Sequence, residues 1–488
     1  MEQFINKILM AGLLSLASAT SFAADYYVVV PVKGKTVNAA DIQVALQAAT
    51  LPAGMVGRAY SYDLKQNLFV TGDPALDLTR ATWSASSALP AGFSLGADGV
   101  VVGTPSVINE TGTSFSVTAD YKAKTSTQTY TLMVNGNALE VLQVSKGYTH
   151  SCAITAVGGV KCWGENNYGQ LGDGTLVSRY SPVSVTGLSS GFVRVEVGYY
   201  HTCAANSAGQ LYCWGSNDYG QVGNGTAGAA VKTPTLVSAL TQVQDFALGN
   251  GSACAIASEG LKCWGLNNTG KLGDGTYTTR SVPTAVQGIP TAIDVAVSQG
   301  HACAVLQGGA LKCWGQDAYG ELGYTASNAN QPLPIQVEGL TSGVVAVDTT
   351  YATTCVVMTG GGAKCWGFNG SGQVGNGTNA HQGAPVDVKN LTGFSVAKIK
   401  TGFSHTCVLS TAGAVKCWGG GTATGVGATW LPLDVTFFPS GVADIAMGGD
   451  GSCVKTYSGV AKCWGNNGSG QLGDGTSQSR SSPVTVLP

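Results

Sequence analysis

Hydrophobic and polar residues alternate in short runs along most of the chain, and turn residues separate the runs. The stretch from Leu139 to Val185 shows the pattern, with strand-like runs at 140–144, 151–155, 160–163 and 182–185. A Gly-Gly pair at 158–159 predicts a tight hairpin, and the Asn- and Gly-rich segment 166–175 predicts a long loop. Four short strands per unit predict one blade of a β-propeller. A solenoid would need distinct capping repeats, and the pattern contains none.

The unit recurs, and a pair of cysteines marks each copy. The string Cys-Trp-Gly occurs seven times with a period of 46–52 residues, which lies in the range of propeller blades. A second cysteine lies nine or ten residues before each string, and these pairs account for all 14 cysteines. The pairs are Cys152 and Cys162, Cys203 and Cys213, Cys254 and Cys263, Cys303 and Cys313, Cys355 and Cys365, Cys407 and Cys417, and Cys453 and Cys463.

We predict that each of these pairs forms a disulfide. Residues directly opposite each other in an antiparallel hairpin lie about 4.5–5.5 Å apart, which is close enough for the bond. The alternative is metal binding, since four repeats place a histidine two residues before a cysteine: His150, His201, His301 and His405. The other three repeats carry different residues there: Ser252, Thr353 and Gly451. We therefore favour disulfides, interpret the histidines as hydrogen-bonded blade residues, and predict no metal or cofactor.

The repeat resembles those of the regulator of chromosome condensation family. The shared pattern is Gly-x-x-His-[Ser/Thr]-Cys-Ala, then Cys-Trp-Gly-x-Asn-x-x-Gly-Gln-Leu-Gly-[Asp/Asn]-Gly-Thr, and it extends over residues 138–488. The resemblance implies a seven-bladed β-propeller. The fourth copy departs from the pattern at 323–325, and the sixth loses most of the loop at 419–425. How the ring closes stays open, although the last strand, at 483–487, completes its own blade.

The residues before the repeats differ from them in composition and in sequence pattern. Residues 1–23 predict a signal peptide, with Lys7 before the apolar run 8–17 and a cleavage site at 21–23. That run is too short to span a bilayer, so we predict no membrane insertion. Residues 24–137 contain no cysteine, and their motif Leu-Pro-x-Gly followed by Gly-x-Val-x-Gly-Thr-Pro resembles an Ig-like β-sandwich. Residues 41–48 predict a short helix in an otherwise all-β chain.

Composition narrows the function classes. Only 11% of the residues are charged and the formal net charge is −2, so we predict no nucleic-acid partner. The sequence shows no metal triad, no phosphate-binding P-loop and no nucleophile elbow, and we predict a protein that is not an enzyme. The tryptophans of Cys-Trp-Gly predict packing between blades, with a sugar-stacking platform as the alternative. Asp-Gly pairs at Asp173, Asp274 and Asp474 predict turns rather than calcium sites.

We predict a protein-binding or scaffold module, located outside the cell, at its surface or in the periplasm, with a place in an adhesin or surface appendage as one form of that function. The partner is expected at one propeller face, where loops vary without disturbing the strands. Four aromatic residues are the predicted contacts: Tyr324, Trp430, Phe437 and Phe438. The alternative for the last three is that they fill space left by the shortened sixth loop. The partner, its face and the oligomeric state are not predicted.

Two other functions remain in view at this point. Some β-lactamase inhibitory proteins resemble this propeller, which makes an inhibitor of a secreted enzyme the main alternative. The family name suggests guanine-nucleotide exchange on a small GTPase. The predicted signal peptide and disulfides argue against that activity, because cytosolic proteins rarely keep disulfides.

Overall fold

The computed structural model describes residues 42–107, 109–135, 138–325 and 329–488. The chain divides into two compact units. One contains most of the residues up to 132, and the other contains 133–488 with the short segments 53–58 and 104–111. The predicted signal peptide, residues 1–23, lies outside the described residues. In the described part of the chain, no helix has the length and apolar character needed to cross a membrane.

The N-terminal unit, together with the short segments 53–58, 104–111 and 133–135, forms an Ig-like β-sandwich. Its strands are β1 (Gln43–Leu46), β2 (Gly54–Met55), β3 (Tyr60–Asp63), β4 (Leu68–Thr71), β5 (Thr82–Ala85), β6 (Phe93–Leu95), β7 (Val100–Gly103), β8 (Asn109–Tyr121) and β9 (Lys124–Asn135), with 3-10 turns η2 (Leu64–Asn67) and η3 (Leu78–Arg80). The sheets have the orders β2-β9-β8-β5 and β3-β7-β6, with β1 paired to β4. Trp83, Val101, Phe115 and Tyr130 are buried in its core.

The helix predicted at 41–48 is wrong. Residues Gln43–Leu46 form β1, which pairs antiparallel with β4 in the register Gln43 to Thr71. The neighbouring strand supplies hydrogen bonds that a helix would have made within itself, and Leu46 turns into the sandwich core.

The repeats form seven four-stranded antiparallel sheets. In chain order the blades are β10 (Val141–Lys146), β11 (His150–Thr155), β12 (Val160–Gly164), β13 (Arg179–Ser184); β14 (Phe192–Val197), β15 (His201–Asn206), β16 (Leu211–Gly215), β17 (Val231–Leu236); β18 (Asp245–Leu248), β19 (Ser252–Ala257), β20 (Gly260–Gly265), β21 (Arg280–Ala285); β22 (Ala292–Val297), β23 (His301–Leu306), β24 (Leu311–Gly315), β25 (Gln331–Gln336); β26 (Val344–Thr350), β27 (Thr353–Met358), β28 (Ala363–Gly367), β29 (Gln382–Asp387); β30 (Val396–Thr401), β31 (His405–Ser410), β32 (Val415–Gly419), β33 (Thr429–Asp434); and β34 (Val442–Gly448), β35 (Gly451–Thr456), β36 (Ala461–Gly465), β37 (Arg480–Thr485). In the sixth blade, the loop between β32 and β33 also contains a 3-10 turn, η4 (Thr422–Thr424).

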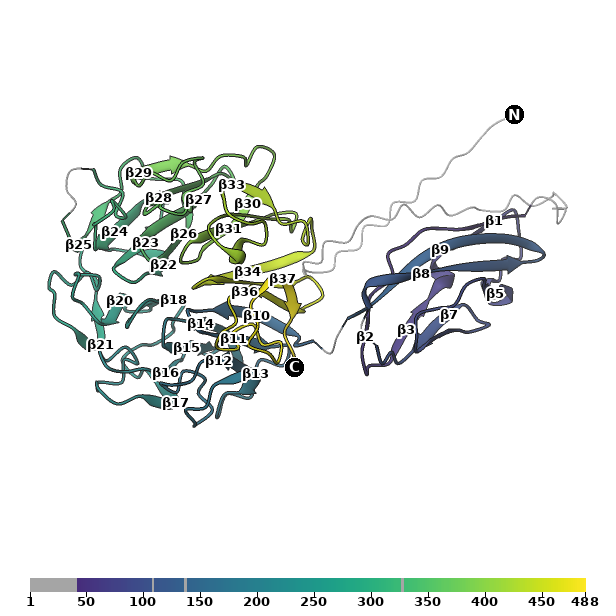
Figure 1. Ribbon diagram of the computed structural model, residues 1–488, viewed down its shortest axis with the longest axis horizontal. Helices are drawn as coiled ribbons and strands as arrows, with labels where there is room; N and C mark the ends of the chain where they lie inside the picture. Colours follow the sequence, from purple (N-terminus) through teal and green to yellow (C-terminus); the bar gives the residue numbers. More distant parts are fainter. Residues whose placement is uncertain (1–41, 108, 136–137, 326–328) are drawn as a thin grey trace, which may run out of the picture. The chain divides into compact units, whose positions relative to one another are not determined.

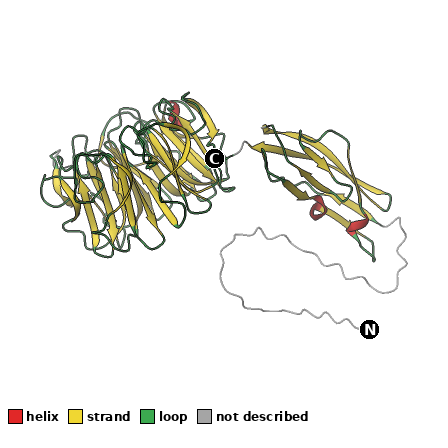
Figure 2. Ribbon diagram, turned by 90° about the horizontal axis from the view of Figure 1, so that it is seen from below, coloured by secondary structure: helices red, strands yellow, loops and turns green. Residues whose placement is uncertain are grey.

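The seven sheets surround a centre, with the first strand of each blade innermost (Figure 1). Strand order within each sheet follows chain order, so every blade runs up and down four times. The first and third loops of each blade therefore emerge at one face of the propeller, which we call the mouth face. The second loop and the link to the next blade emerge at the other, which we call the hairpin face. Figure 2 shows the strands running between these loops.

Neighbouring blades are joined by the repeated tryptophans. All seven indole rings are fully buried, and Trp214, for example, packs against Cys152 and Leu171 of the first blade. Six of them donate their N–H to a backbone carbonyl of the preceding blade, over 2.8–3.0 Å. The tryptophans thus pack between blades as predicted, and their burial excludes a sugar-stacking role.

The ring closes where the first blade meets the seventh, and the hydrogen bonds at this seam are the same as those between blades that follow each other in the chain. Between the first two blades, Val160 N–H donates to Leu188 O and Phe192 N–H donates to Gly158 O. At the seam the same bonds run from Ala461 N–H to Leu139 O and from Val141 N–H to Gly459 O. Leu139 N–H also donates to Val486 O over 2.9 Å. The seventh blade keeps its own four strands, so closure needs no blade shared between the two ends of the repeat region.

Candidate functional site

Each of the seven disulfides joins the second and third strands of one blade. The pairs are Cys152–Cys162, Cys203–Cys213, Cys254–Cys263, Cys303–Cys313, Cys355–Cys365, Cys407–Cys417 and Cys453–Cys463. The partners lie directly opposite in the strand register, with Cα atoms 4.0–4.1 Å apart, and every cysteine is fully buried. Seven buried disulfides are typical of proteins in an oxidising compartment.

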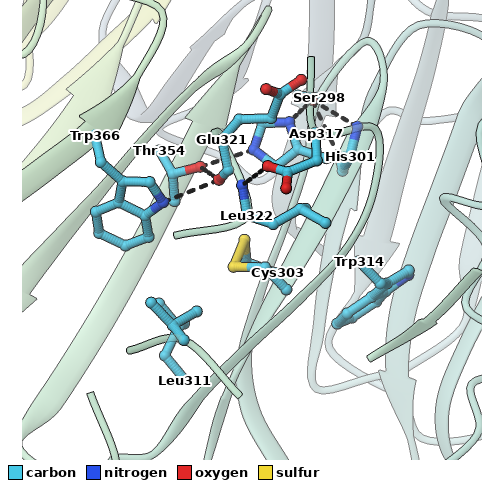
Figure 3. Close-up of a disulfide and its surroundings, with 12 residues drawn as sticks. Ser298, His301, Cys303, Leu311, Trp314, Asp317, Glu321, Leu322, Thr354 and Trp366 are labelled. Carbon is cyan, nitrogen blue, oxygen red and sulfur yellow. Dashed lines mark hydrogen bonds between the residues drawn. A yellow bond between two sulfur atoms is a disulfide. The ribbon is translucent and has the colours of Figure 1, made fainter. Parts of the chain in front are cut away.

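Three of the four histidines near the cysteines contact a hydroxyl of the next blade: His150, His301 and His405. The ring nitrogens of His201 are buried without a hydrogen-bond partner among the described residues. Figure 3 shows His301, whose Nε2 is 2.8 Å from the Thr354 hydroxyl of the next blade and whose Nδ1 is 2.8 Å from Ser298 Oγ. Burial lowers the pKa of His301 to about 3, so the ring is neutral at physiological pH. The described residues contain no group of three or more His, Cys, Asp or Glu side chains placed to hold a metal ion.

The Asp-Gly pairs close turns, as the sequence predicted. Asp173 accepts hydrogen bonds from the backbone N–H and hydroxyl of Thr175, and it pairs with Arg179 at 3.0 Å. Asp274 and Asp474 repeat this arrangement with Arg280 and Arg480. A carboxylate already bound by an arginine and a backbone amide is a turn element. A further string, Gly-x-Ser-x-Gly at 187–191, lies in the turn between β13 and β14, without the helix that follows a nucleophile elbow.

Two buried carboxyls distinguish the fourth blade. In the first blade, Asn166 accepts from Leu171 N–H and donates its amide to loop oxygens such as Val177 O, 3.2 Å away. Asp317 stands in the equivalent position and accepts from Leu322 N–H, but its Oδ2 has no hydrogen-bond partner in the described structure. Figure 3 shows Asp317 and Glu321 in the same loop.

Glu321 stands where four other repeats have glutamine (Gln170, Gln221, Gln373 and Gln471) and where the third repeat has Lys271. One of its carboxylate oxygens accepts from Tyr319 N–H over 2.7 Å, while Oε1 is buried and finds no donor among the described residues. Burial raises the pKa of Glu321 to about 7 and that of Asp317 to about 6. Asp317 lacks the amide donor that Asn166 gives to the loop oxygens of the first blade.

An arc of nine aromatic rings lies on the mouth face. Neighbouring centroids are 4.6–6.4 Å apart along the whole arc. We call this set the aromatic arc, and in spatial order it consists of Tyr168, Tyr200, Tyr199, Tyr148, Phe403, Tyr351, Phe368, Tyr319 and His381. All nine residues come from the first or third loops of blades 1, 2, 4, 5 and 6.

The first loops of the blades create the inner part of the arc. Tyr148 and Tyr199 stack with 5.1 Å between centroids, and Tyr351 lies 4.6 Å from Phe403. Tyr148 in blade 1 and Phe403 in blade 6 have ring centroids 6.2 Å apart, although blade 7 lies between these two blades. The first loop of blade 7 carries Gly449 at this point, and the glycine leaves room for the rings to approach each other. The arc is open at blades 3 and 4, whose first loops carry polar residues instead. Burial raises the pKa of Tyr199, so its phenol stays neutral at physiological pH.

The arc borders the central channel. A cavity of about 130 Å³ is lined by the first strands of the blades together with Tyr148 and Tyr199. The charged groups inside it support the ring: Asp348 accepts from Thr401 N–H at 2.7 Å and pairs with Lys400, and Asp294 accepts from Val347 N–H. These bonds satisfy backbone amides at the inner edge of each sheet, where no strand is available. The channel charges are therefore structural, and the mouth is the part free to meet a ligand.

The four predicted contact residues do not lie together. Trp430 is 48% exposed at the start of the outermost strand β33, near the mouth face but away from the channel. Phe437 is 51% exposed in the link after β33, on the hairpin face. Tyr324 is half-buried in the third loop of blade 4. Phe438 is buried against Trp464, 5.8 Å between centroids, so it fills the core and is not available to a partner.

Sequence reasoning missed the aromatic arc, although a signal for it was present. The repeat pattern leaves open the residue that follows the glycine of the first loop. That position is aromatic in four of the seven copies: Tyr148, Tyr199, Phe403 and Tyr351, the last of which follows Thr350 in place of the glycine. Because strand order places all first loops around the channel, these four residues converge even though they are about 50 residues apart.

The fold and its site define a repeat-built β-propeller with an exposed aromatic surface at one mouth. Residues 158–205, 208–256, 263–305 and 365–409 match the regulator of chromosome condensation (RCC1) repeat, and a second description of that repeat matches 141–170, 192–221, 292–321, 396–423 and 442–471. The chain belongs to the RCC1 repeat family. Residues 35–135 match an Ig domain family, He_PIG.

Curated relatives match short stretches of the chain. Human E3 ubiquitin-protein ligase HERC2 is 38% identical over 122 residues, which cover 25% of this chain and 2% of HERC2. The Ultraviolet-B receptor UVR8 of Arabidopsis thaliana is 34% identical over 125 residues, which cover 25% of this chain and 28% of the receptor. The match thus spans well under a third of either relative.

Solved structures share the propeller fold. Human WBSCR16 superposes with a TM-score of 0.60 at 21% identity, covering 67% of this chain and 93% of WBSCR16. Yeast RCC1 (Prp20), in a complex with Kap60, superposes with a TM-score of 0.61 at 18% identity, covering 72% of this chain and 85% of Prp20. At these identities the likeness extends to the fold alone.

Proposed function

We propose that this chain is a protein-binding module outside the cytosol, and that its partner docks on the mouth face over the aromatic arc. The observation that carries the proposal is the continuous run of nine rings around one channel mouth. Tyrosine and other aromatic residues are enriched at the centres of protein interfaces, where they bury much area and lose little side-chain entropy. Tyr148 and Tyr168 are each 38% exposed, which is unusual for rings packed in a cluster.

The fold supports binding more than catalysis. Seven sheets, seven disulfides and hydrogen-bonded blade interfaces hold the arc on a rigid base, and rigidity lowers the entropy cost of association. The structure of Prp20p from Saccharomyces cerevisiae was described together with its binding properties to Gsp1p and histones, so an RCC1-type propeller supports protein binding in that case. We do not transfer those partners, because the likeness at 19% identity concerns the fold.

The compartment is part of the proposal. Disulfide bonds persist in oxidising environments, and a signal peptide at 1–23 would direct the chain there. A place at the cell surface, in the periplasm or in an adhesin or appendage fits an Ig-like domain ahead of the propeller. An inhibitor of a secreted enzyme such as a β-lactamase would use the same mouth face and differs in having one hydrolase as its partner.

Site-specific photo-crosslinking on producing cells tests the proposal. A photoreactive residue is placed at Tyr168 on the mouth face or at Tyr457, a 65% exposed residue in the second loop of blade 7 on the hairpin face. We expect a defined adduct from position 168 only. The adduct should weaken at least about tenfold when Tyr148→Ala is added, the size of effect seen at interface hot spots. Phe437→Ala, on the hairpin face, should leave it unchanged.

The outcomes separate the candidates. A single hydrolase recovered in equal amount with this chain would establish the inhibitor function. Structural or surface proteins in the adduct would establish the scaffold function. Adducts of equal yield from both faces, or from position 457 alone, would overturn the placement of the partner on the aromatic arc.

A further inference from the structure

Nearly all of the charged residues in the loops of the mouth face are acidic. Their acidic residues are Glu165, Asp173, Asp218, Asp274, Asp317, Glu321, Asp450 and Asp474, and their single basic residue is Lys271. The whole chain is close to balanced, with 25 basic and 27 acidic residues. The imbalance therefore belongs to this face and gives it a negative potential.

Several of these charges are already used within the fold. Asp173, Asp274 and Asp474 pair with arginines at the start of the outer strands, and Asp317 and Glu321 are buried. Lys271 is buried too and donates to Asn250 O at 2.8 Å and Gln299 O at 2.7 Å, so it offers no cation to a partner. Three carboxylates remain toward solvent: Glu165, Asp218 and Asp450. Lys146 at the end of β10 is near Asp450: burial lowers the pKa of Lys146 to about 8, and the charge of Asp450 opposes that shift.

Each remaining carboxylate belongs to a loop that carries, or contacts, an aromatic residue. Asp218 precedes Tyr219, which is 44% exposed, and Glu165 lies in the loop of Tyr168. Asp450 follows Gly449, the glycine beneath Tyr148, and accepts a hydrogen bond from Ser404 Oγ at 3.1 Å. A carboxylate next to the negative face of an aromatic ring is the surrounding that a Lys or Arg side chain prefers.

Asp450 lies next to Gly449, which contacts both Tyr148 and the backbone of Phe403. The rings of Tyr148 and Phe403 are 6.2 Å apart and tilted by 52°, and the backbone N–H of Phe403 donates to Gly449 O at 2.9 Å. The aromatic rings and the carboxylate therefore sit on a backbone that hydrogen bonds hold in place. The hydrogen bond from Ser404, the residue after Phe403, joins the Asp450 carboxylate to this part of the arc.

Resting on the binding function proposed above, we propose that the partner presents a basic loop, with a Lys or Arg side chain placed over Tyr148 and Phe403 and beside Asp450. Apolar residues next to that cation would cover the rest of the arc. Recognition would depend on the partner's cation and on salt concentration. Weak binding at high salt and fast association at low salt follow from this electrostatic match.

A library of disulfide-cyclised heptapeptides displayed on phage provides the test. It is selected on the full oxidised chain and counter-selected on the Tyr148→Ala variant, so that only sequences that need the arc survive. We expect survivors to be enriched in Arg or Lys next to an aromatic or aliphatic residue. Survivors that are acidic or uncharged would overturn this inference while leaving the proposed function intact. Selection that yields no sequence dependent on Tyr148 would overturn both.

Binding constants of the selected peptides then locate the cation. Asp450→Asn keeps the acceptor for Ser404 and removes the charge, and we expect it to weaken binding about three- to tenfold and to flatten the dependence on salt. Asp450→Lys should weaken it further. Asp434→Asn is the matched control, because this carboxylate is exposed on the hairpin face and pairs with Lys416. Equal effects of the substitutions at 450 and 434, or none at 450, would overturn the placement.

Discussion

The indole N–H of Trp163 in the first blade donates a hydrogen bond to the carbonyl oxygen of Gln471 in the last blade, with 3.0 Å between the two atoms. The same carbonyl accepts from the Ser151 hydroxyl at 2.9 Å. These bonds cross the seam of the ring, where no peptide bond connects neighbouring blades. The equivalent nitrogen of Trp464 finds no partner in the described structure, and the third loop that faces it, in blade 6, is the shortened one.

This difference between two equivalent tryptophans predicts unequal effects of one substitution. Trp163→Phe removes a buried hydrogen bond and should lower the free energy of unfolding by about 0.5–1.5 kcal/mol more than Trp464→Phe does. Both substitutions remove a similar amount of buried apolar area, so the second is the control for the first. Denaturant unfolding of the two variants and the parent measures the difference. Equal losses would mean that the repeated bond contributes no net stability.

The disulfides predict a specific set of crosslinked peptides. Non-reducing digestion and mass spectrometry of the exported chain should recover seven links, each between two cysteines nine or ten residues apart. Replacing both Cys254 and Cys263 with Ala should cost about 2–3 kcal/mol, since each link closes a loop of about ten residues. A link between blades, or free thiols in native material, would contradict the assignment and remove the main support for an oxidising compartment.

Ring closure predicts a local response to truncation. Val486 accepts from Leu139 N–H and donates to Ala461 O, so removing residues 486–488 should free the start of the first blade. Amide exchange is expected to rise in β10 and β34 on either side of the seam, and to stay unchanged in β22 on the far side of the ring. Exchange followed by mass spectrometry checks this. A uniform rise over all blades would show that the seam is not a separate opening unit.

The blades could be predicted from the sequence because the hydrophobic alternation and the turn residues recur at the same positions in each repeat. Gly158 adopts a positive φ of 77° in the hairpin that brings Cys152 opposite Cys162, which is the geometry expected from a Gly-Gly pair between two cysteines. Local chemistry decides such features, so a single copy predicts them. The signal for β1 was weaker, because its pairing with β4 depends on a partner 25 residues away.

The binding surface could not be predicted in the same way. Tyr148 and Phe403 are separated by more than 250 residues, and only the closed ring brings them within 6.2 Å. Phe438 shows the opposite error: it lies outside the repeat pattern and is hydrophobic, yet it fills the space beside Trp464. Departure from a repeat therefore marks compensation in the core as readily as it marks a contact surface.

The buried carboxyls of the fourth blade predict a pH-dependent stability with a defined sign. The pKa of Glu321 in the folded chain, about 7, lies above the ordinary value of 4.5, so the folded state holds its proton more tightly than the unfolded state. Below about pH 4.5 the group is protonated in both states and costs nothing. Its destabilising effect grows as the pH rises toward 7 and is constant above that. Glu321→Gln should therefore stabilise the chain at pH 8 by about 1–3 kcal/mol and have little effect at pH 4.5.

A matched substitution in the fifth blade tests the cause. Gln373 is the equivalent residue there, its Oε1 accepts from Ser371 N–H at 2.9 Å, and it is buried. Gln373→Glu should reproduce the fourth-blade arrangement and lower stability at pH 8 but not at pH 4.5, while Asp317→Asn should act in the same direction as Glu321→Gln. Urea unfolding at the two pH values measures all three. If Glu321→Gln gave the same change at both pH values, its effect would come from packing, and the raised pKa of the Glu321 carboxyl would not govern the stability of this blade.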